Sequence, residues 1–252
     1  MLGIYLSGTG NTKYCMNRLV KGLESNATIM SLDNPDLVKA ITENDVIILG
    51  YPTQFSNSPY MVRDFIHNNS TIWKGKQILC VATMGAFSGD GAGCTARILK
   101  KYGAHILGGL HIRMPDSVCD SKLLKKPVEK NREIVAKATR KIEQTIISIK
   151  KGKYPKDGIT FFAHIAGLFG QRLWFYNKTS EYSNKLKISE TCVGCGLCVK
   201  SCPMKNLSIS EGKVMSGGRC TMCYSCISQC PHRAITLLGE EVKEQCRLEK
   251  YL

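Results

Sequence analysis

Eight of the thirteen cysteines in this 252-residue chain fall into two copies of one pattern near the C-terminus. Each copy reads Cys-x2-Cys-x2-Cys-x3-Cys-Pro; the first starts at Cys192 and the second at Cys220, 28 residues later. Three cysteines at such steps wrap the backbone around one [4Fe-4S] cluster, and the remote fourth cysteine ligates the other cluster. The spacing therefore predicts two interleaved clusters, which constrains this segment more than any other feature of the chain.

The interleaving assigns every cysteine of the two patterns to one cluster. We call the first ligand set cluster I; it comprises Cys192, Cys195, Cys198 and Cys230. The second set, cluster II, comprises Cys220, Cys223, Cys226 and Cys202. Structural zinc is the alternative, because zinc also binds Cys-x2-Cys pairs. Zinc sites usually combine two separated pairs, however, and not triplets followed by Cys-Pro.

The segment resembles the bacterial-type two-cluster ferredoxin over roughly residues 183–240, with one repeat at 183–211 and the other at 212–240. The resemblance implies low-potential one-electron transfer in a small α+β module. It also implies short strands near residues 186–188, 207–210 and 235–238. The remaining cysteines lack ligand spacing and are expected to be buried or incidental thiols: Cys15, Cys80, Cys94, Cys119 and Cys246.

Residues 1–150 alternate short apolar runs with helical patterns. The apolar runs predict strands over residues 1–6, 27–32, 46–50, 78–82 and 106–112. Helices are expected over residues 12–23, from Pro35, and over 59–67, 92–102 and 127–150. This alternation predicts an α/β domain with a doubly wound five-stranded parallel sheet and right-handed crossovers. Ligands of such sheets bind at the carboxyl ends of the strands.

A glycine-rich loop directly follows the first predicted strand and opens the first helix. It consists of Ser7, Gly8, Thr9, Gly10, Asn11 and Thr12. Flexible backbone, hydroxyl groups and a helix N-terminus suit a phosphate group, although the loop holds no Lys or Arg. The string matches neither the P-loop nor the dinucleotide fingerprint. An ordinary turn that caps a helix is the alternative interpretation.

This loop resembles the phosphate loop of flavodoxins, especially clostridial ones, which bind flavin mononucleotide (FMN) non-covalently. The resemblance covers about residues 1–145 by element order, and it implies a flavodoxin-like fold. In that family the loops after the third and fourth strands hold the isoalloxazine ring. Here those loops supply the candidate contacts Pro52, Thr53, Phe55, Met84, Gly85, Phe87 and Gly91. Phe55 and Phe87 could cover the ring or anchor their loops in the core. Neither loop contains Trp, and the chain is basic where flavodoxins are usually acidic.

Residues 151–182 form a connector whose stretch from Phe161 to Tyr176 is aromatic and compatible with a helix. Sixteen residues are too few to span a bilayer. Packing over the flavodoxin-like domain or between the modules is the first expectation, and peripheral contact with a membrane surface is the alternative. Trp174 and Phe175 are hypothesised to line the path between flavin and cluster.

The net charge of +15 suggests an acidic partner. The helix from Pro127 onward is strongly basic, so an acidic ferredoxin, flavodoxin or oxidoreductase is the expected redox partner, and a merely solvated face is the alternative. No block of like charges suggests a nucleic-acid-binding tail. No secretory signal and no membrane-spanning run are visible, so a cytoplasmic protein is expected.

These features predict an electron-transfer flavo-iron–sulfur protein that passes electrons between two [4Fe-4S] clusters and FMN. The alternative is a ferredoxin-dependent flavin reductase acting on a quinone, nitro compound or other small acceptor. The sequence contains no recognisable catalytic dyad, triad or carboxylate pair. Whether the protein is an enzyme therefore stays open, and an electron carrier is the first interpretation.

Overall fold

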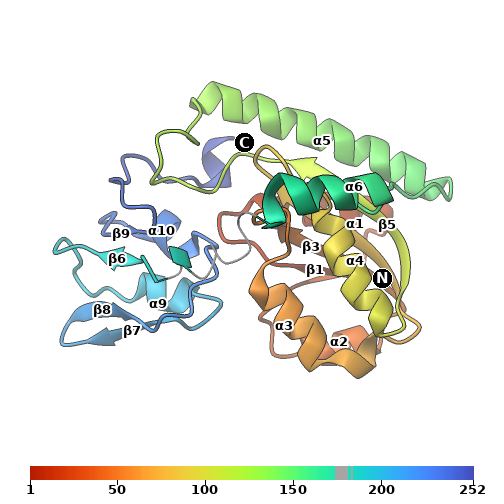
Figure 1. Cartoon of the computed structure of the whole chain (residues 1–252), viewed down its shortest axis with the longest axis horizontal. Helices are drawn as coiled ribbons and strands as arrows, with labels where there is room; N and C mark the ends of the chain where they lie inside the picture. The colour runs from red at the N-terminus through yellow and green to blue at the C-terminus, as the bar shows by residue number, and fades with distance from the viewer. Residues whose placement is uncertain (174–180, 183) are drawn as a thin grey trace.

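The structure is a computed structural model that describes residues 1–173, 181–182 and 184–252, without the side chains of residues 171 and 172 (Figure 1). The first 150 residues form a five-stranded parallel sheet in the order β2-β1-β3-β4-β5. Its strands are β1 (Leu2–Tyr5), β2 (Thr28–Ser31), β3 (Val46–Pro52), β4 (Gln77–Met84) and β5 (His105–Arg113). This order is that of flavodoxin-like folds, so the predicted doubly wound sheet is confirmed.

Helices cover both faces of the sheet because the central strands are apolar on both sides. Their bounds are α1 (Asn11–Leu23), α2 (Leu37–Thr42), α3 (Tyr60–Asn68), α4 (Gly91–Lys101) and α5 (Val128–Lys150), with a 3-10 turn η1 (Ser70–Trp73) after α3. On one face, Met16 and Leu19 of α1 pack with Val135 and Ile142 of α5. The residues of α2, α3 and α4 form a second core on the opposite face.

The cysteine-rich segment forms a separate small module with two antiparallel pairs of strands. β6 (Lys187–Ile188) pairs with β9 (Ile235–Thr236), and β7 (Leu207–Ser210) pairs with β8 (Lys213–Ser216). Two five-residue helices, α9 (Leu197–Ser201) and α10 (Ser225–Gln229), each contain the third cysteine of a repeat. The expected strands are present, and β8 is an additional one. It forms because Glu211 and Gly212 both adopt positive φ, the conformation of a tight hairpin turn.

Two further segments lie against the flavodoxin-like domain. In the connector, α6 (Phe161–Gly167) lies over α4, and the π-helical segment η2 (Leu168–Arg172) continues it. The predicted path residues Trp174 and Phe175 lie outside the described residues. After the module, the chain returns to the sheet through the 3-10 turn η3 (Leu248–Lys250), where the Leu248 amide donates to the Thr9 carbonyl at 3.1 Å. None of the described helices has the length and hydropathy needed to cross a membrane.

Candidate functional site

A pocket of about 370 Å³ lies at the carboxyl ends of β1, β3, β4 and β5. This volume is within the range of about 300–1,000 Å³ that small-molecule sites occupy. Eleven of the thirteen residues predicted to contact FMN line it: Ser7, Gly8, Thr9, Asn11, Thr12, Pro52, Thr53, Phe55, Met84, Gly85 and Phe87. The three predicted loops are therefore brought together at one edge of the sheet.

The other two predicted residues, Gly10 and Gly91, lie outside the pocket lining. Gly10 has a φ of 93°, and a Cβ placed on it would lie 3.2 Å from Leu248 of the C-terminal segment. Gly91 begins α4 and is buried, and its carbonyl accepts a hydrogen bond from the Tyr51 hydroxyl at 2.9 Å. Both glycines serve the packing of the loops around the pocket.

The glycine-rich loop presents a neutral cradle that fits an anionic phosphate. Thr9 and Thr12 are held by hydroxyl hydrogen bonds to Ser117 (2.9 Å) and Thr83 (2.8 Å). The Ser7 hydroxyl is buried and has no hydrogen-bond partner among the described residues. Helix α1 begins at the end of this loop, so its unpaired amides and dipole favour negative charge there. An unsatisfied hydroxyl beside a helix N-terminus is the donor set that a phosphate requires.

A fourth loop, which follows β5, also lines the pocket and was not predicted. It contributes Pro115, Asp116, Ser117 and Val118, and the Asn11 side-chain amide donates to the Pro115 carbonyl at 2.8 Å. Burial raises the pKa of the Asp116 carboxyl, although its oxygen accepts a hydrogen bond from the Val118 amide at 2.9 Å. The predicted sheet could have indicated this loop, because the carboxyl end of β5 lies at the same edge of the sheet as those of the other parallel strands.

Two aromatic side chains of the predicted ring loops lie at the pocket. Phe55 stacks on Tyr182 of the connector, with ring centroids 6.4 Å apart and planes inclined by 27°. Phe87 is 47% exposed. Neither ring is an anchor buried in the hydrophobic core, so both can face a flat ligand.

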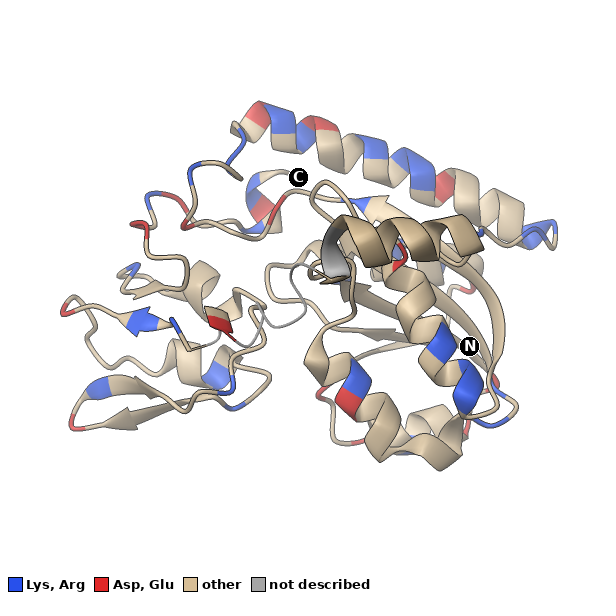
Figure 2. Cartoon of the chain, viewed as in Figure 1, with Lys and Arg blue, Asp and Glu red and all other residues tan. Residues whose placement is uncertain are grey.

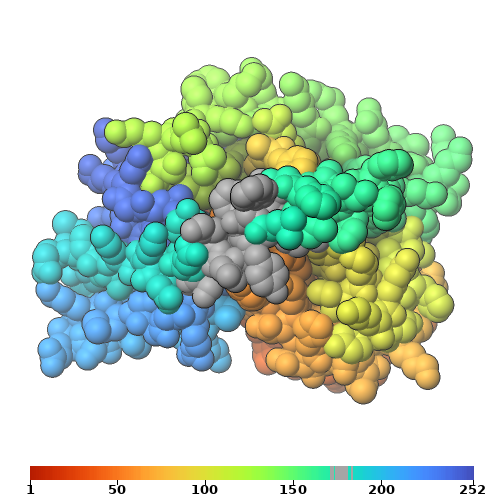
Figure 3. Space-filling view, in the orientation of Figure 1, coloured from red at the N-terminus to blue at the C-terminus, as the bar shows by residue number. Residues whose placement is uncertain are grey.

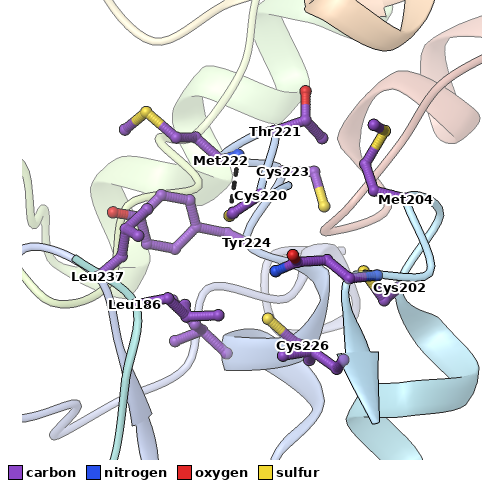
Figure 4. Close-up of a pocket in the computed structure, with 13 residues that line it drawn as sticks. Leu186, Cys202, Met204, Cys220, Thr221, Met222, Cys223, Tyr224, Cys226 and Leu237 are labelled. Carbon is purple, nitrogen blue, oxygen red and sulfur yellow. Dashed lines mark hydrogen bonds between the residues drawn. The ribbon is translucent and has the colours of Figure 1, made fainter. Parts of the chain in front are cut away.

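The eight cysteines of the repeats divide into the two predicted sets around two separate pockets. One pocket is lined by Cys192, Cys195, Cys198 and Cys230. The other is lined by Cys202, Cys220, Cys223 and Cys226 (Figure 4). The fourth cysteine of each repeat therefore crosses to the other triplet, as the interleaved assignment requires.

Backbone amides point at several of these sulfur atoms. Asn206 donates to Cys202 Sγ at 3.3 Å, and Met222 donates to Cys220 Sγ at 3.3 Å (Figure 4). Amide hydrogen bonds to ligand sulfurs stabilise a negatively charged cluster and are one determinant of its potential. The described residues contain no three His, Cys, Asp or Glu side chains positioned to hold a single metal ion.

Burial shapes the chemistry of the cluster II thiols. It raises the pKa of Cys223 to about 12, and it also raises the pKa of Cys220 and Cys226. A thiol must lose its proton to bind a metal, so a bound metal has to compensate the charge of these thiolates. Burial also raises the pKa of Cys198 of cluster I, whereas Cys195 of the same set is exposed.

The second cysteine repeat forms part of the wall of the sheet-edge pocket. Met222, Cys223 and Tyr224 line that pocket together with the flavodoxin-like loops. Gly8 lies so close to Cys223 that a Cβ on Gly8 would be 2.8 Å from the Cys223 carbonyl carbon and would overlap its oxygen. The Gln54 side-chain amide donates to the Met222 carbonyl at 3.3 Å and also to that of Thr221. We call these contacts the domain junction.

A buried carboxylate completes the domain junction. Asp120 follows the loop after β5 and is fully buried. One of its oxygens accepts from the Tyr224 hydroxyl at 3.0 Å, and the other accepts from the amides of Leu237 (2.5 Å) and Leu238 (2.7 Å). Three donors from the module thus satisfy one carboxylate of the flavodoxin-like domain, and bonds to an ionised group are stronger than neutral ones.

The five cysteines outside the repeats are buried or half-buried thiols, as expected. Burial raises the pKa of Cys15 and Cys80 to about 12. Cys119 and Cys246 differ because their side chains are hydrogen-bonded to each other, which lowers the pKa of Cys119. This contact joins the loop after β5 to the C-terminal segment beside the domain junction.

Comparisons with known proteins match both parts of the chain. A family model described as a flavodoxin domain matches residues 2–106, and one described as a 4Fe-4S dicluster domain matches residues 184–232. The chain is a fusion of a flavodoxin domain and a 4Fe-4S dicluster domain. A comparison with curated proteins finds no match.

Several solved flavodoxin structures are similar to the flavodoxin domain. The two-electron reduced flavodoxin of Megasphaera elsdenii is 23% identical, covers 44% of this chain and 85% of its own, and has a TM-score of 0.40. A flavodoxin from the domain Archaea is 15% identical over 59% of this chain and 97% of its own, with a TM-score of 0.42. Oxidised flavodoxin 2 from Bacillus cereus is 21% identical with the same coverage and a TM-score of 0.40.

Proposed function

We propose that this protein transfers electrons between FMN, bound in the sheet-edge pocket, and two [4Fe-4S] clusters. The two domains by themselves support an electron-transfer flavo-iron–sulfur role. The observation that carries the finer proposal is the shared wall of the pocket, where Met222, Cys223 and Tyr224 meet the flavodoxin loops. FMN, when bound, supplies one- and two-electron chemistry, and each cluster supplies one-electron chemistry.

The residues of the pocket divide between the two ends of FMN. Ser7, Thr9 and Thr12, with the N-terminus of α1, would hold the phosphate, because they offer hydroxyl and amide donors without a cation. Phe55 and Phe87 would cover the ring, since both line the pocket outside the hydrophobic core. The protein's part is to place and orient the cofactors and to exclude water from the space between them.

The two cysteine sets occupy different positions in this scheme. Cluster II contributes Cys223 to the pocket wall, whereas none of the described residues that line the cluster I pocket lines the sheet-edge pocket. Cys195 of cluster I is exposed. Cluster II would therefore be the inner centre next to FMN, and cluster I the outer centre that exchanges electrons with a partner.

The excess of positive charge on α5 suits an acidic redox partner. Five exposed cations lie along this helix (Figure 2): Lys130, Arg132, Lys137, Arg140 and Lys141. A positive surface attracts an acidic ferredoxin or flavodoxin and raises the association rate. Reversing charge at Lys137 and Arg140 should slow reduction by an acidic ferredoxin, with the largest effect at low ionic strength.

The cofactor content of anaerobically purified protein tests this proposal first. We expect about eight irons, eight acid-labile sulfides and one FMN per chain. Cys195→Ser and Cys223→Ser should each lose one cluster, whereas Cys246→Ser, outside the repeats, should keep the full iron content. Full iron with no flavin, even after addition of excess FMN, would refute the assignment of the pocket, and zinc in place of iron would refute that of the module.

A kinetic experiment tests whether electrons reach the flavin through both clusters. Reduced ferredoxin should reduce the flavin rapidly in the wild-type protein and slowly in both cluster variants. A direct chemical reductant should still reduce the flavin in each variant. Saturable and selective turnover of one acceptor from a panel of quinones and nitro compounds would favour a reductase instead of a carrier.

A further inference from the structure

Helix α6 and the following η2 expose a stripe of large apolar side chains. Phe161 is 72% exposed, Phe162 is 81% exposed and Phe169 is 61% exposed. Ile165 and Leu173 continue the stripe at one-turn spacing and are also exposed. Figure 3 shows this segment at the surface of the face in view. Contiguous exposed apolar patches on a water-soluble surface mark interaction sites, whereas single exposed residues do not.

The inner side of the same helix is polar. His164 Nδ1 is 2.9 Å from an Asp90 carboxylate oxygen, and Asp90 is fully buried. Gly167 lies against Gly89 and Asp90 with no room for a side chain, and the Thr160 hydroxyl caps the helix by accepting from the Ala163 amide at 3.3 Å. A helix that covers a core buries its apolar side. Here a buried carboxylate and a glycine contact fix the helix with its aromatic side outward.

This orientation refines the expectation for the connector. The helix packs over the flavodoxin domain, as predicted, but it does so through His164 and Gly167 instead of through its aromatic residues. Phe161 and Phe162 therefore face away from the flavodoxin domain and are exposed at the surface.

Positive charge borders the stripe. Lys100 and Lys101 end α4 and are exposed, and Lys100 lines a pocket of about 240 Å³ together with Arg97 and Phe161. In Figure 2, α6 carries no charged residue and lies beside α4, which carries Lys and Arg. Flanking cations disfavour a second copy of the same face and favour a surface with negative charge.

We propose that this face, formed by α6, η2, Lys100 and Lys101, binds the surface of a bilayer that contains anionic phospholipids. Phe and Leu side chains of interfacial helices enter the boundary between headgroups and acyl chains. Lysines near the surface add attraction to anionic headgroups. The polar anchors of α6 then hold the helix parallel to the protein surface, so the aromatic side chains can enter the membrane without unfolding the connector.

Co-sedimentation of the holoprotein with lipid vesicles tests this proposal. We expect binding to vesicles of phosphatidylcholine mixed with phosphatidylglycerol, weaker binding to phosphatidylcholine alone, and loss of the difference at high salt. Phe161→Ser combined with Phe162→Ser should weaken binding to the anionic vesicles by at least about tenfold. Both side chains are mostly exposed, so the double variant should retain its iron and flavin content.

A matched control separates this face from general surface hydrophobicity. Leu123→Ser removes an apolar side chain that is 93% exposed in the loop before α5, and it should leave vesicle binding unchanged. Lys100→Glu with Lys101→Glu should reduce binding to anionic vesicles only. No sedimentation with anionic vesicles, or an equal loss in Leu123→Ser, would overturn the proposal. A dimer that the double Phe variant converts to monomer, without vesicle binding, would assign the face to a second copy of the chain instead.

Discussion

Gly8→Ala is the most direct probe of the domain junction. The residue does not have the positive φ that only glycine tolerates, so the backbone itself accepts alanine. The added methyl group meets the Cys223 backbone, with the carbonyl carbon at 2.8 Å and the oxygen closer still. A backbone group cannot rotate away as a side chain can. Overpacking of this kind costs about 1–3 kcal/mol, which would raise the population of undocked module roughly 5- to 150-fold.

Hydrogen exchange measures that population directly. We expect faster exchange at residues 221–224 and 237–238, where the module meets the flavodoxin domain, and unchanged exchange in the central strands β3 and β4. Gly170→Ala is the matched control, because its added methyl group would only come within 3.5 Å of the Phe87 ring, an ordinary contact. If Gly8→Ala exchanges like the wild-type protein, the module does not rest on the phosphate loop and the shared pocket wall is wrong.

Four further predictions concern single side chains. Ser7→Ala should weaken FMN binding about 5- to 30-fold without lowering the stability of the FMN-free protein, because the buried hydroxyl has no other partner; fluorescence titration measures this. Asp120→Ala leaves three module donors unsatisfied and should destabilise docking by about 2–4 kcal/mol, seen by hydrogen exchange. Asp116→Asn removes negative charge beside the pocket and should raise the flavin reduction potential in a redox titration. Burial lowers the pKa of His111 below its usual value of 6.5. The neutral imidazole therefore contributes to stability above pH 6.5, and this contribution is lost as the pH falls below that value. His111→Gln should flatten the fall in Tm between neutral and mildly acidic pH.

The sheet could be predicted from sequence because its signals are local. Val46 to Gly50 is apolar without interruption, as in a strand buried on both faces, and β3 indeed spans it. The alternation of such strands with helices leaves few topologies, since right-handed crossovers remove most others. The two cysteine sets were equally predictable, because a fixed spacing and a fourth cysteine that crosses over leave one interleaved assignment.

The domain junction could not be predicted in the same way. Asp120, Gln54 and Gly8 have no local pattern that marks a contact with the module, and each acquires that contact from a segment more than 100 residues away. The orientation of α6 could not be predicted from the sequence for a similar reason. Its apolar periodicity predicts a helix, but only the partner Asp90 shows that the polar side of that helix faces inward.

The shared pocket wall links FMN binding to docking of the module. A ligand that contacts both domains binds the docked form more tightly than the undocked form, so it must stabilise docking by the same free energy. At saturation, a ligand that binds the docked form tenfold more tightly adds about 1.4 kcal/mol, which is within the range of the cost expected for Gly8→Ala. Excess FMN should therefore slow the exchange of residues 221–224 in that variant back toward the wild-type rate. If FMN saturates the variant and exchange stays fast, the flavin touches only the flavodoxin loops, and the cluster II residues do not form a wall of its site.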